Sequence, residues 1–273
     1  MGTPPTGSHV TAPSLPSDAA APAVHAHDLV VSYDGVVALR AADLTLPRGR
    51  TTALIGPNGS GKSTLLNAIA GLAEVQGVMN VLGRRPRVAR RSIAYVLQTT
   101  GINERVPLTV REVVTMGRYA ELGAVRRLRA EDREIVDDSL ERLDITDLAG
   151  RHITELSGGQ RQRVFVAQGL AQRADLLLLD EPGTGLDFVS EERIADVVQQ
   201  EVDRGRTVIV STHDFADAQA ADVVVLLAGE VVAVGPPEDI LTQELISTAF
   251  GGHAHVLDDG TVLIDDPHHH GYL

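Results

Sequence analysis

The segment TTALIGPNGSGKST, residues 51–64, constrains the fold of this chain more than any other stretch. Its first five residues have the length and composition of a buried strand, and they run directly into a glycine-rich loop. The loop matches the pattern G-x-x-x-x-G-K-[ST]. The residues that follow, 62–72, have helical periodicity and end near a glycine. A strand, such a loop and a helix in this order predict a P-loop α/β fold.

The chemistry expected of this loop is the binding of nucleotide phosphates. Glycines allow the backbone to bend tightly, so that its N–H groups and the start of the next helix converge on phosphate oxygens. Lys62 is the only lysine among the 24 Lys and Arg residues, and it is expected to reach the β- and γ-phosphates. A compact ammonium fits a crowded cradle better than a wide guanidinium. The predicted loop ligands are Gly56, Pro57, Asn58, Gly59, Ser60, Gly61, Lys62, Ser63 and Thr64.

The rest of the chain predicts how this fold continues. Residues 1–23, rich in Pro, Ala, Ser and Thr, are expected to form a disordered tail. Apolar stretches on both sides of Asp34-Gly35 predict antiparallel strands. Beyond residue 175, strand-like and helical segments alternate, as in LLLLDE, SEERIADVVQQEVDRG, TVIVST, DFADAQAA and DVVVLLAG. This alternation favours a mostly parallel core sheet covered by helices.

The middle of the chain predicts an inserted helical subdomain at about 99–173. Residues 109–122 and 130–145 have helical periodicity with charged outer faces, and a third helix is expected to start after LSGG. We expect one domain at 24–250, followed by a C-terminal extension at 251–273. That extension is predicted to hold a hairpin around Asp259-Gly260 and a histidine-rich end, which is either a metal-binding tract or a solvated tail.

Two further motifs carry chemistry. The run LLLLDE ends in Asp180, expected to hold Mg²⁺, and Glu181, the natural general base for water attacking the γ-phosphorus. In LSGGQ at 156–160, Ser157 is a good helix N-cap, and the two glycines let backbone N–H groups approach an anion. One nucleotide needs only one such helix start, so the second is better explained if it serves a nucleotide on a partner. An ordinary capped helix is the alternative.

Taken together, these motifs resemble the ATP-binding subunit of an ABC transporter, over about residues 24–250. Walker A corresponds to 56–64, the signature to 156–160, and Walker B to 176–180 followed by the catalytic glutamate. The resemblance implies that the nucleotide contacts of the signature are Ser157, Gly158, Gly159 and Gln160.

Four more positions match the family residue by residue. The resemblance implies that Tyr33 stacks on adenine and that Gln98 senses Mg²⁺ and the membrane partner. It implies that Asp187 lies in a loop crossing a dimer interface and that His213 contacts the γ-phosphate. An ordinary strand tyrosine and a structural histidine are the plainer alternatives. The expected catalytic residues are therefore Glu181, His213 and Lys62, and the expected Mg²⁺ ligands are Ser63, Gln98 and Asp180.

The resemblance also implies an assembly. Two copies would join head to tail around two ATP molecules, on the cytoplasmic face of the cell membrane, and drive integral permease subunits. The segments 107–119, 158–172 and 181–187 look most like the zinc and manganese importers, which an extracytoplasmic metal-binding protein would serve indirectly. In 181–187 the order Glu-Pro-Gly-Thr-Gly-Leu-Asp departs from the more general family pattern. Importers of iron–siderophore, haem or cobalamin are the alternative.

Charge and composition argue against several other classes of protein. A formal net charge of −13 argues against a nucleic-acid partner, and apolar runs are too short to span a membrane. Cysteine is absent, so disulfide and thiolate chemistry are excluded. A soluble ABC ATPase acting in translation or on DNA is the alternative from another class. It usually carries two cassettes or long coiled coils, whereas this sequence has one cassette.

Overall fold

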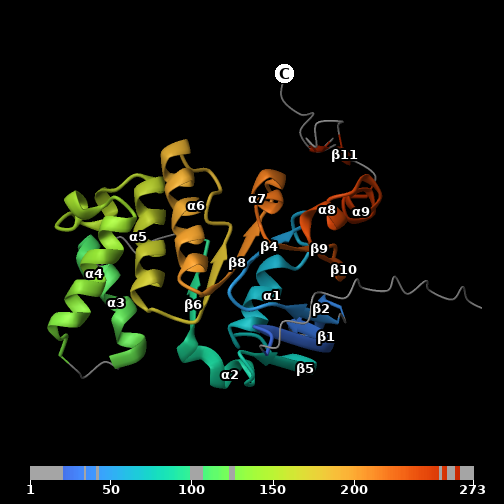
Figure 1. Cartoon of the computed structure of the whole chain (residues 1–273), viewed down its shortest axis with the longest axis horizontal. Coiled ribbons are helices and arrows are strands. Elements are labelled where there is room, and N and C mark those ends of the chain that lie inside the picture. Colours follow the sequence, from blue (N-terminus) through green and yellow to red (C-terminus); the bar gives the residue numbers. More distant parts are fainter. Residues whose placement is uncertain are drawn as a thin grey trace, which may run out of the picture.

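The computed structural model describes residues 21–33, 35–40, 43–98, 107–122 and 127–251, and the backbone of two short strands at 254–256 and 262–264. A six-stranded sheet forms the centre, in the order β10-β9-β4-β8-β7-β6 (Figure 1). Its strands are, in this order, Val231–Gly235, Val223–Leu227, Thr51–Ile55, Thr207–Thr212, Leu176–Asp180 and Ile93–Val96. All neighbours are parallel except β10, which pairs antiparallel with β9. The prediction of a mostly parallel core sheet is confirmed.

Both faces of the central sheet are buried, which explains the continuous apolar runs of its strands. Successive side chains of a strand point to opposite faces, so the leucines of β7 alternate between two clusters. Leu176 and Leu178 join the cluster around α1 (Lys62–Ile69). Leu177 and Leu179 join the cluster under α5 (Gly158–Ala171) and α6 (Phe188–Asp203). Each fully buried leucine contributes about 2 kcal/mol of hydrophobic stabilisation.

A second, antiparallel sheet forms around β1 (Val24–Tyr33), as predicted for the N-terminal part. It pairs with β2 (Val36–Leu39), β3 (Leu44–Leu46) and β5 (Val75–Val81). The predicted second strand is thus two strands, both paired with β1. Asp34 of the predicted turn lies outside the described residues, and Tyr33 faces Val36 across it. The expected tail also lies outside them up to residue 20, whereas the Ala23 N–H donates to the Leu46 carbonyl.

Among the described residues, three α-helices lie between β6 and β7 in the chain, as the sequence predicted. They are α3 (Val110–Leu122), α4 (Ala130–Arg142) and α5 (Gly158–Ala171), and Figure 1 shows them grouped at one end of the molecule. A short α2 (Pro86–Ala89) precedes β6. Residues 99–106, at the expected start of the helical subdomain, lie outside the described part of the chain.

The C-terminal part contains elements that the sequence analysis did not identify. After α6 (Phe188–Asp203) and α7 (Phe215–Gln219) come β10 and then α8 (Pro237–Ile240) and α9 (Gln243–Ala249). Beyond them β11 (Ala254–Val256) pairs antiparallel with β12 (Val262–Ile264), the two strands of the predicted hairpin. The turn at Asp259-Gly260 and the histidines at 268–270 lie outside the described residues.

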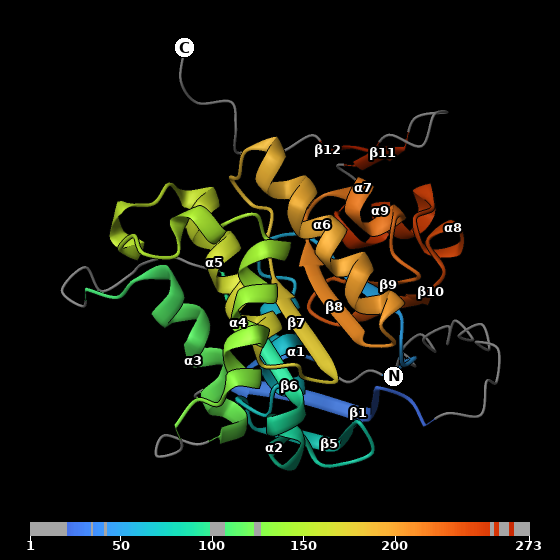
Figure 2. The same cartoon turned by 60° about the vertical axis from the view of Figure 1, so that its left-hand side comes forward.

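The strand order places the predicted motifs at one edge of the sheet. Strands β4, β8 and β7 are neighbours in the central sheet, and Figure 2 shows β7 beside β8. In register, Ile55 faces Thr212 and Asp180 faces Ser211. Parallel strands have their carboxyl ends at the same edge of a sheet. The glycine-rich loop after β4, the pair Asp180 and Glu181 at the end of β7, and His213 after β8 therefore lie at that edge.

Candidate active site

The glycine-rich loop lies over a cavity of about 390 Å³ at the carboxyl edge of the sheet. The loop sits tightly on the end of β9, since a side chain at Gly56 would collide with the Leu227 carbonyl oxygen. Gly61 forms the N-cap of α1 with φ of 102°, a conformation that favours glycine. The cavity is lined by Val37, Ala38, Arg40, Asn58, Gly59, Ser60, Gly61, Lys62, Ser63, Thr64, Glu181 and Gly229. Most of the predicted phosphate ligands therefore surround one space.

Backbone carbonyl groups of the glycine-rich loop hold the Lys62 side chain in place. Its side chain is 5% exposed, and Nζ donates to the carbonyl oxygens of Gly56 at 2.8 Å and Pro57 at 3.3 Å. Nζ also lies 3.8 Å from Glu181 Oε1. Burial lowers the pKa of the Lys62 ammonium, while the nearby carboxylates of Glu181 and Asp180 oppose that shift. A buried cation at the head of a helix gives this space an anion-binding character.

Asp180 ends β7 inside a network of hydroxyl groups. Its Oδ1 accepts hydrogen bonds from Ser211 Oγ at 2.6 Å and Ser63 Oγ at 3.1 Å, and its Oδ2 accepts one from the Tyr95 hydroxyl at 3.3 Å. Burial raises the pKa of Tyr95, so the phenol stays protonated and remains a donor. Neighbouring oxygen ligands of an octahedral Mg²⁺ lie about 3 Å apart. The Ser63 and Asp180 oxygens therefore fit this ion in chemistry and in spacing.

Glu181 follows Asp180 in a backbone conformation that turns its side chain toward the loop. Its φ is 45°, and its N–H contacts the Ser211 carbonyl and hydroxyl oxygens at 3.2 and 2.9 Å. The carboxylate Oε2 accepts hydrogen bonds from Gln98 Nε2 at 3.1 Å and from Thr184 Oγ1 at 3.2 Å. Glu181 is therefore joined to Lys62, to Gln98 and to the turn that follows it.

His213, which follows β8, reaches this group through a residue that the sequence analysis did not single out. Its Nδ1 lies 3.5 Å from Thr184 Oγ1. The structure thus brings together Lys62, Ser63, Asp180, Glu181 and, through Thr184, His213. Gln98 joins by way of Glu181, and among the described residues it has no hydrogen bond to Ser63 or Asp180.

Three residues of this network were missed because their signal is weak in sequence. Ser211 and Tyr95 lie on strands whose apolar pattern hides a polar function, and Thr184 lies in an ordinary-looking turn. Only the register of β7 with its two neighbours brings Ser211 and Tyr95 to Asp180. A prediction of the strand pairing, rather than any motif, could have identified Ser211 and Tyr95.

The signature segment forms a separate helix start. Ser157 caps α5 and accepts a hydrogen bond from the Gln160 N–H, and the Gln160 side chain returns a bond to the Ser157 N–H, as a capping box does. A side chain at Gly159 would meet Asp187 Oδ2 at 2.7 Å, so the signature touches the start of α6. Asp187 caps α6, and hydrogen bonds from Ser190 lower its pKa. None of these signature residues is among those lining the cavity over the loop.

Tyr33 lies at the end of β1 and is 43% exposed. It is not among the residues that line the cavity over the loop, although Val37 and Ala38 of the paired strand β2 are. An exposed aromatic ring beside a phosphate-binding cavity is available to stack on a base. The structure leaves this expected role as a prediction.

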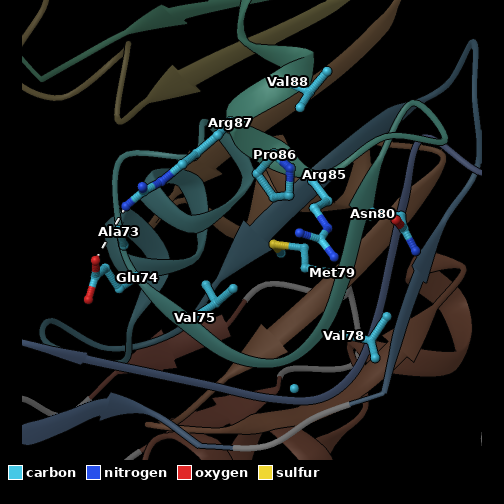
Figure 3. A pocket seen from close by; sticks show the side chains of 12 residues that line it. Ala73, Glu74, Val75, Val78, Met79, Asn80, Arg85, Pro86, Arg87 and Val88 are labelled. Atoms are coloured by element: carbon cyan, nitrogen blue, oxygen red, sulfur yellow. Dashed lines mark hydrogen bonds and ion pairs between the residues drawn. The ribbon is translucent and has the colours of Figure 1, made fainter.

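A second cavity, of about 670 Å³, lies between α2 and β5. Figure 3 shows Arg85 directed into it beside Met79, with the ion pair of Glu74 and Arg87 at its edge. The predicted site residues are not among those that line it. The larger hollow is therefore distinct from the candidate active site.

Comparisons with known proteins show which family this chain belongs to. A family model described as ABC transporter matches residues 39–184. The chain is 38% identical to the manganese transport system ATP-binding protein MntB of Halalkalibacterium halodurans, over 85% of this chain and 93% of that protein. It is 41% identical to the chelated iron transport system membrane protein YfeB of Yersinia pestis, over 88% of this chain and 83% of the relative.

Solved structures give the same result. The chain superposes on an ABC transporter in an inward-facing conformation with a TM-score of 0.74 and 27% identity, covering 89% of this chain and 95% of the other. Within the described residues, no helix is both long and apolar enough to cross a membrane. Since the family model spans more than half of the chain and the relatives most of it, the chain belongs to the ABC transporter family, as an ATP-binding and ATP-hydrolysing subunit.

Proposed function

We propose that this chain powers the import of a transition-metal ion, manganese or zinc. The observation that carries the proposal is the similarity, across most of the chain, to ATP-binding proteins named for manganese and zinc transport. The relative YfeB, named for chelated iron, makes iron the second candidate. The group of side chains around Lys62, Asp180 and Glu181 supports the hydrolysis of ATP.

In this proposal the loop binds the phosphates of ATP. Backbone N–H groups of 56–64 surround the phosphates, and Lys62 moves its ammonium from the Gly56 and Pro57 carbonyls to the β- and γ-phosphate oxygens. Ser63, Asp180 and Gln98 would hold Mg²⁺, which neutralises the phosphate charge when bound. The distance of 3.1 Å between the oxygens of Ser63 and Asp180 supports this assignment for those two residues.

Glu181 is proposed as the general base of hydrolysis. Its carboxylate lies on the cavity over the loop and takes a proton from the attacking water. His213 contacts the γ-phosphate, and Tyr33 stacks on the adenine ring. The contacts of Glu181 with Lys62, Gln98 and Thr184 support this role, because they hold the carboxylate beside the phosphate cradle.

The signature residues and Asp187 are proposed to act across a dimer. The capped start of α5 is a second anion-binding site, and it is not part of the cavity that its own chain forms over the loop. A head-to-tail pair of chains would bring Ser157, Gly158, Gly159 and Gln160 of one copy to the nucleotide of the other. The starts of α1 and α5 would then each bind a phosphate group.

The membrane partner is proposed to be an integral permease, contacted from the cytoplasmic face. The docking surface surrounds Gln98 and the start of the helical subdomain, near residues 99–119. Leu97, next to Gln98, and Met116 and Tyr119 of α3 are exposed there. An extracytoplasmic metal-binding protein would deliver the ion to the permease. Gln98, which touches Glu181, would link this surface to the site of hydrolysis.

The role of Glu181 is tested with the Glu181→Gln variant. The amide keeps the shape of the side chain but accepts no proton, so ATP should bind and hydrolysis should nearly cease. Size-exclusion chromatography with ATP and Mg²⁺ should show a trapped dimer of the 29.0 kDa chain. Normal turnover by a monomeric variant would show that Glu181 is not the base.

The cargo is tested in a deletion strain. Growth and cellular metal content should be measured under zinc, manganese and iron limitation, with complementation by the intact gene as the control. A defect confined to manganese or zinc supports the proposal. A defect confined to iron would support the second candidate instead.

A further inference from the structure

We propose that Thr184 is a positioning residue for ATP hydrolysis, which joins the Glu181 carboxylate to the His213 imidazole. The inference rests on the proposed function, in which Glu181 is the base. Thr184 lies between the two side chains, with Oγ1 at 3.2 Å from Glu181 Oε2 and at 3.5 Å from His213 Nδ1. Thr184 entered the sequence analysis only as part of the segment 181–187, and its side chain was assigned no role.

The single proton of the Thr184 hydroxyl determines which of its two hydrogen bonds Thr184 donates and which it accepts. A hydroxyl donates one hydrogen bond and accepts others. A carboxylate only accepts, so the proton of Thr184 goes to Glu181 Oε2. A lone pair of the same oxygen then accepts from His213 Nδ1–H. Thr184 thereby fixes both the orientation of the base and the tautomer of the imidazole.

These contacts distinguish the two oxygens of Glu181. Oε2 accepts from both Thr184 and Gln98, whereas Oε1 faces only the Lys62 ammonium, at 3.8 Å, among the contacts of the described residues. When Lys62 turns to the phosphates of ATP, Oε1 is the oxygen left to receive a proton. The attacking water then gives its proton to Oε1 and bonds to the γ-phosphorus. The bond from phosphorus to the β-phosphate oxygen breaks, and its electron pair leaves with ADP.

The backbone around Thr184 supports a fixed position. Residues 181–184 form a tight turn, in which the Thr184 N–H contacts the Glu181 carbonyl at 3.4 Å. A side chain at Gly183 would meet the Glu191 carboxylate of α6 at 3.2 Å, so the turn lies close against that helix. A β-branched side chain has few χ1 rotamers, which keeps the hydroxyl directed at its two partners.

The test compares Thr184→Val, which keeps the shape, with Thr184→Ser, which keeps the hydroxyl. Thr184 is exposed, so neither change should unfold the chain. The loss of one hydrogen bond to a charged group should lower kcat of Thr184→Val about tenfold. Its Kd for ATP should stay within about twofold of the original, since ground-state binding is untouched. Thr184→Ser should restore most of kcat.

Thr248→Val is the matched control, because this exposed threonine of α9 donates only to the Glu244 carbonyl and should not affect kcat. In the Glu181→Gln background, Thr184→Val should cause no further loss. If Thr184→Val keeps the original kcat while Glu181→Gln is inactive, this inference is overturned and the proposed function stays intact. Activity in Glu181→Gln would instead overturn the proposed base. A loss shared by the Val and Ser variants would show that only packing matters, which also overturns the inference.

Discussion

At the scale of single residues, Lys62 illustrates how shape and charge act together. Its ammonium is buried and donates to two carbonyl oxygens of its own loop, 2.8 and 3.3 Å away. These carbonyls hold the cation in the site before any phosphate arrives. The planar fork of an arginine is wider and needs acceptors in its own plane. The presence of the only lysine of the sequence at this position therefore has a geometric reason.

We predict that Lys62→Arg weakens ATP binding by more than tenfold, about 1.4 kcal/mol or more, although the charge is conserved. The guanidinium cannot occupy the space between the Gly56 and Pro57 carbonyls without displacing the loop. Titration with a fluorescent ATP analogue measures Kd, and thermal unfolding checks that the fold is retained. Lys62→Gln, which removes the charge, is the comparison. Near-normal binding by the arginine variant would mean that charge alone is required.

At the scale of elements, the helices α3 and α5 cross very closely at Gly117. A Cβ there would overlap the Gln168 carbonyl oxygen and lie 3.0 Å from the Ala171 Cβ. We predict that Gly117→Ala is destabilising. Forcing an atom into this contact costs about 3 kcal/mol, whereas the better helix propensity of alanine returns about 1 kcal/mol, for a net loss of about 2 kcal/mol.

Urea unfolding of Gly117→Ala measures this loss. The matched control is Gly150→Ala, at an exposed position where an added Cβ meets nothing within 4 Å. Its stability should change by less than about 0.5 kcal/mol. Equal stability of the two variants would mean that α3 and α5 can separate without cost.

The elements also show what a sequence can predict. The start of α5 was predictable because Ser157 and Gln160 are local capping signals, and β7 was predictable because both faces of the sheet bury its leucines. The elements β10, α8 and α9 were missed, since they are only five, four and seven residues long. Lys62, Ser63, Asp180 and Glu181 could be named from motifs. Thr184, Ser211 and Tyr95 could not, because their partners come from other strands and turns.

At the scale of the whole molecule, the proposed dimer explains why an apolar surface is exposed. Phe188 and Val189, at the start of α6, are 75% and 61% exposed. They directly follow Asp187, which touches the signature. Large exposed apolar side chains often mark an interaction surface. In a head-to-tail dimer, a second copy would cover this surface when ATP closes the pair.

We predict that Phe188→Glu prevents the ATP-dependent dimer that Glu181→Gln should form. A charge placed in a closing apolar contact opposes its desolvation, whereas the monomer keeps its core and its ATP site. Light scattering of the double variant with ATP should report the 29.0 kDa monomer. Val88→Glu, at an exposed valine of α2 away from the signature, is the control and should leave the dimer intact. If Phe188→Glu still dimerises and Val88→Glu does not, the two copies meet through the face that carries α2.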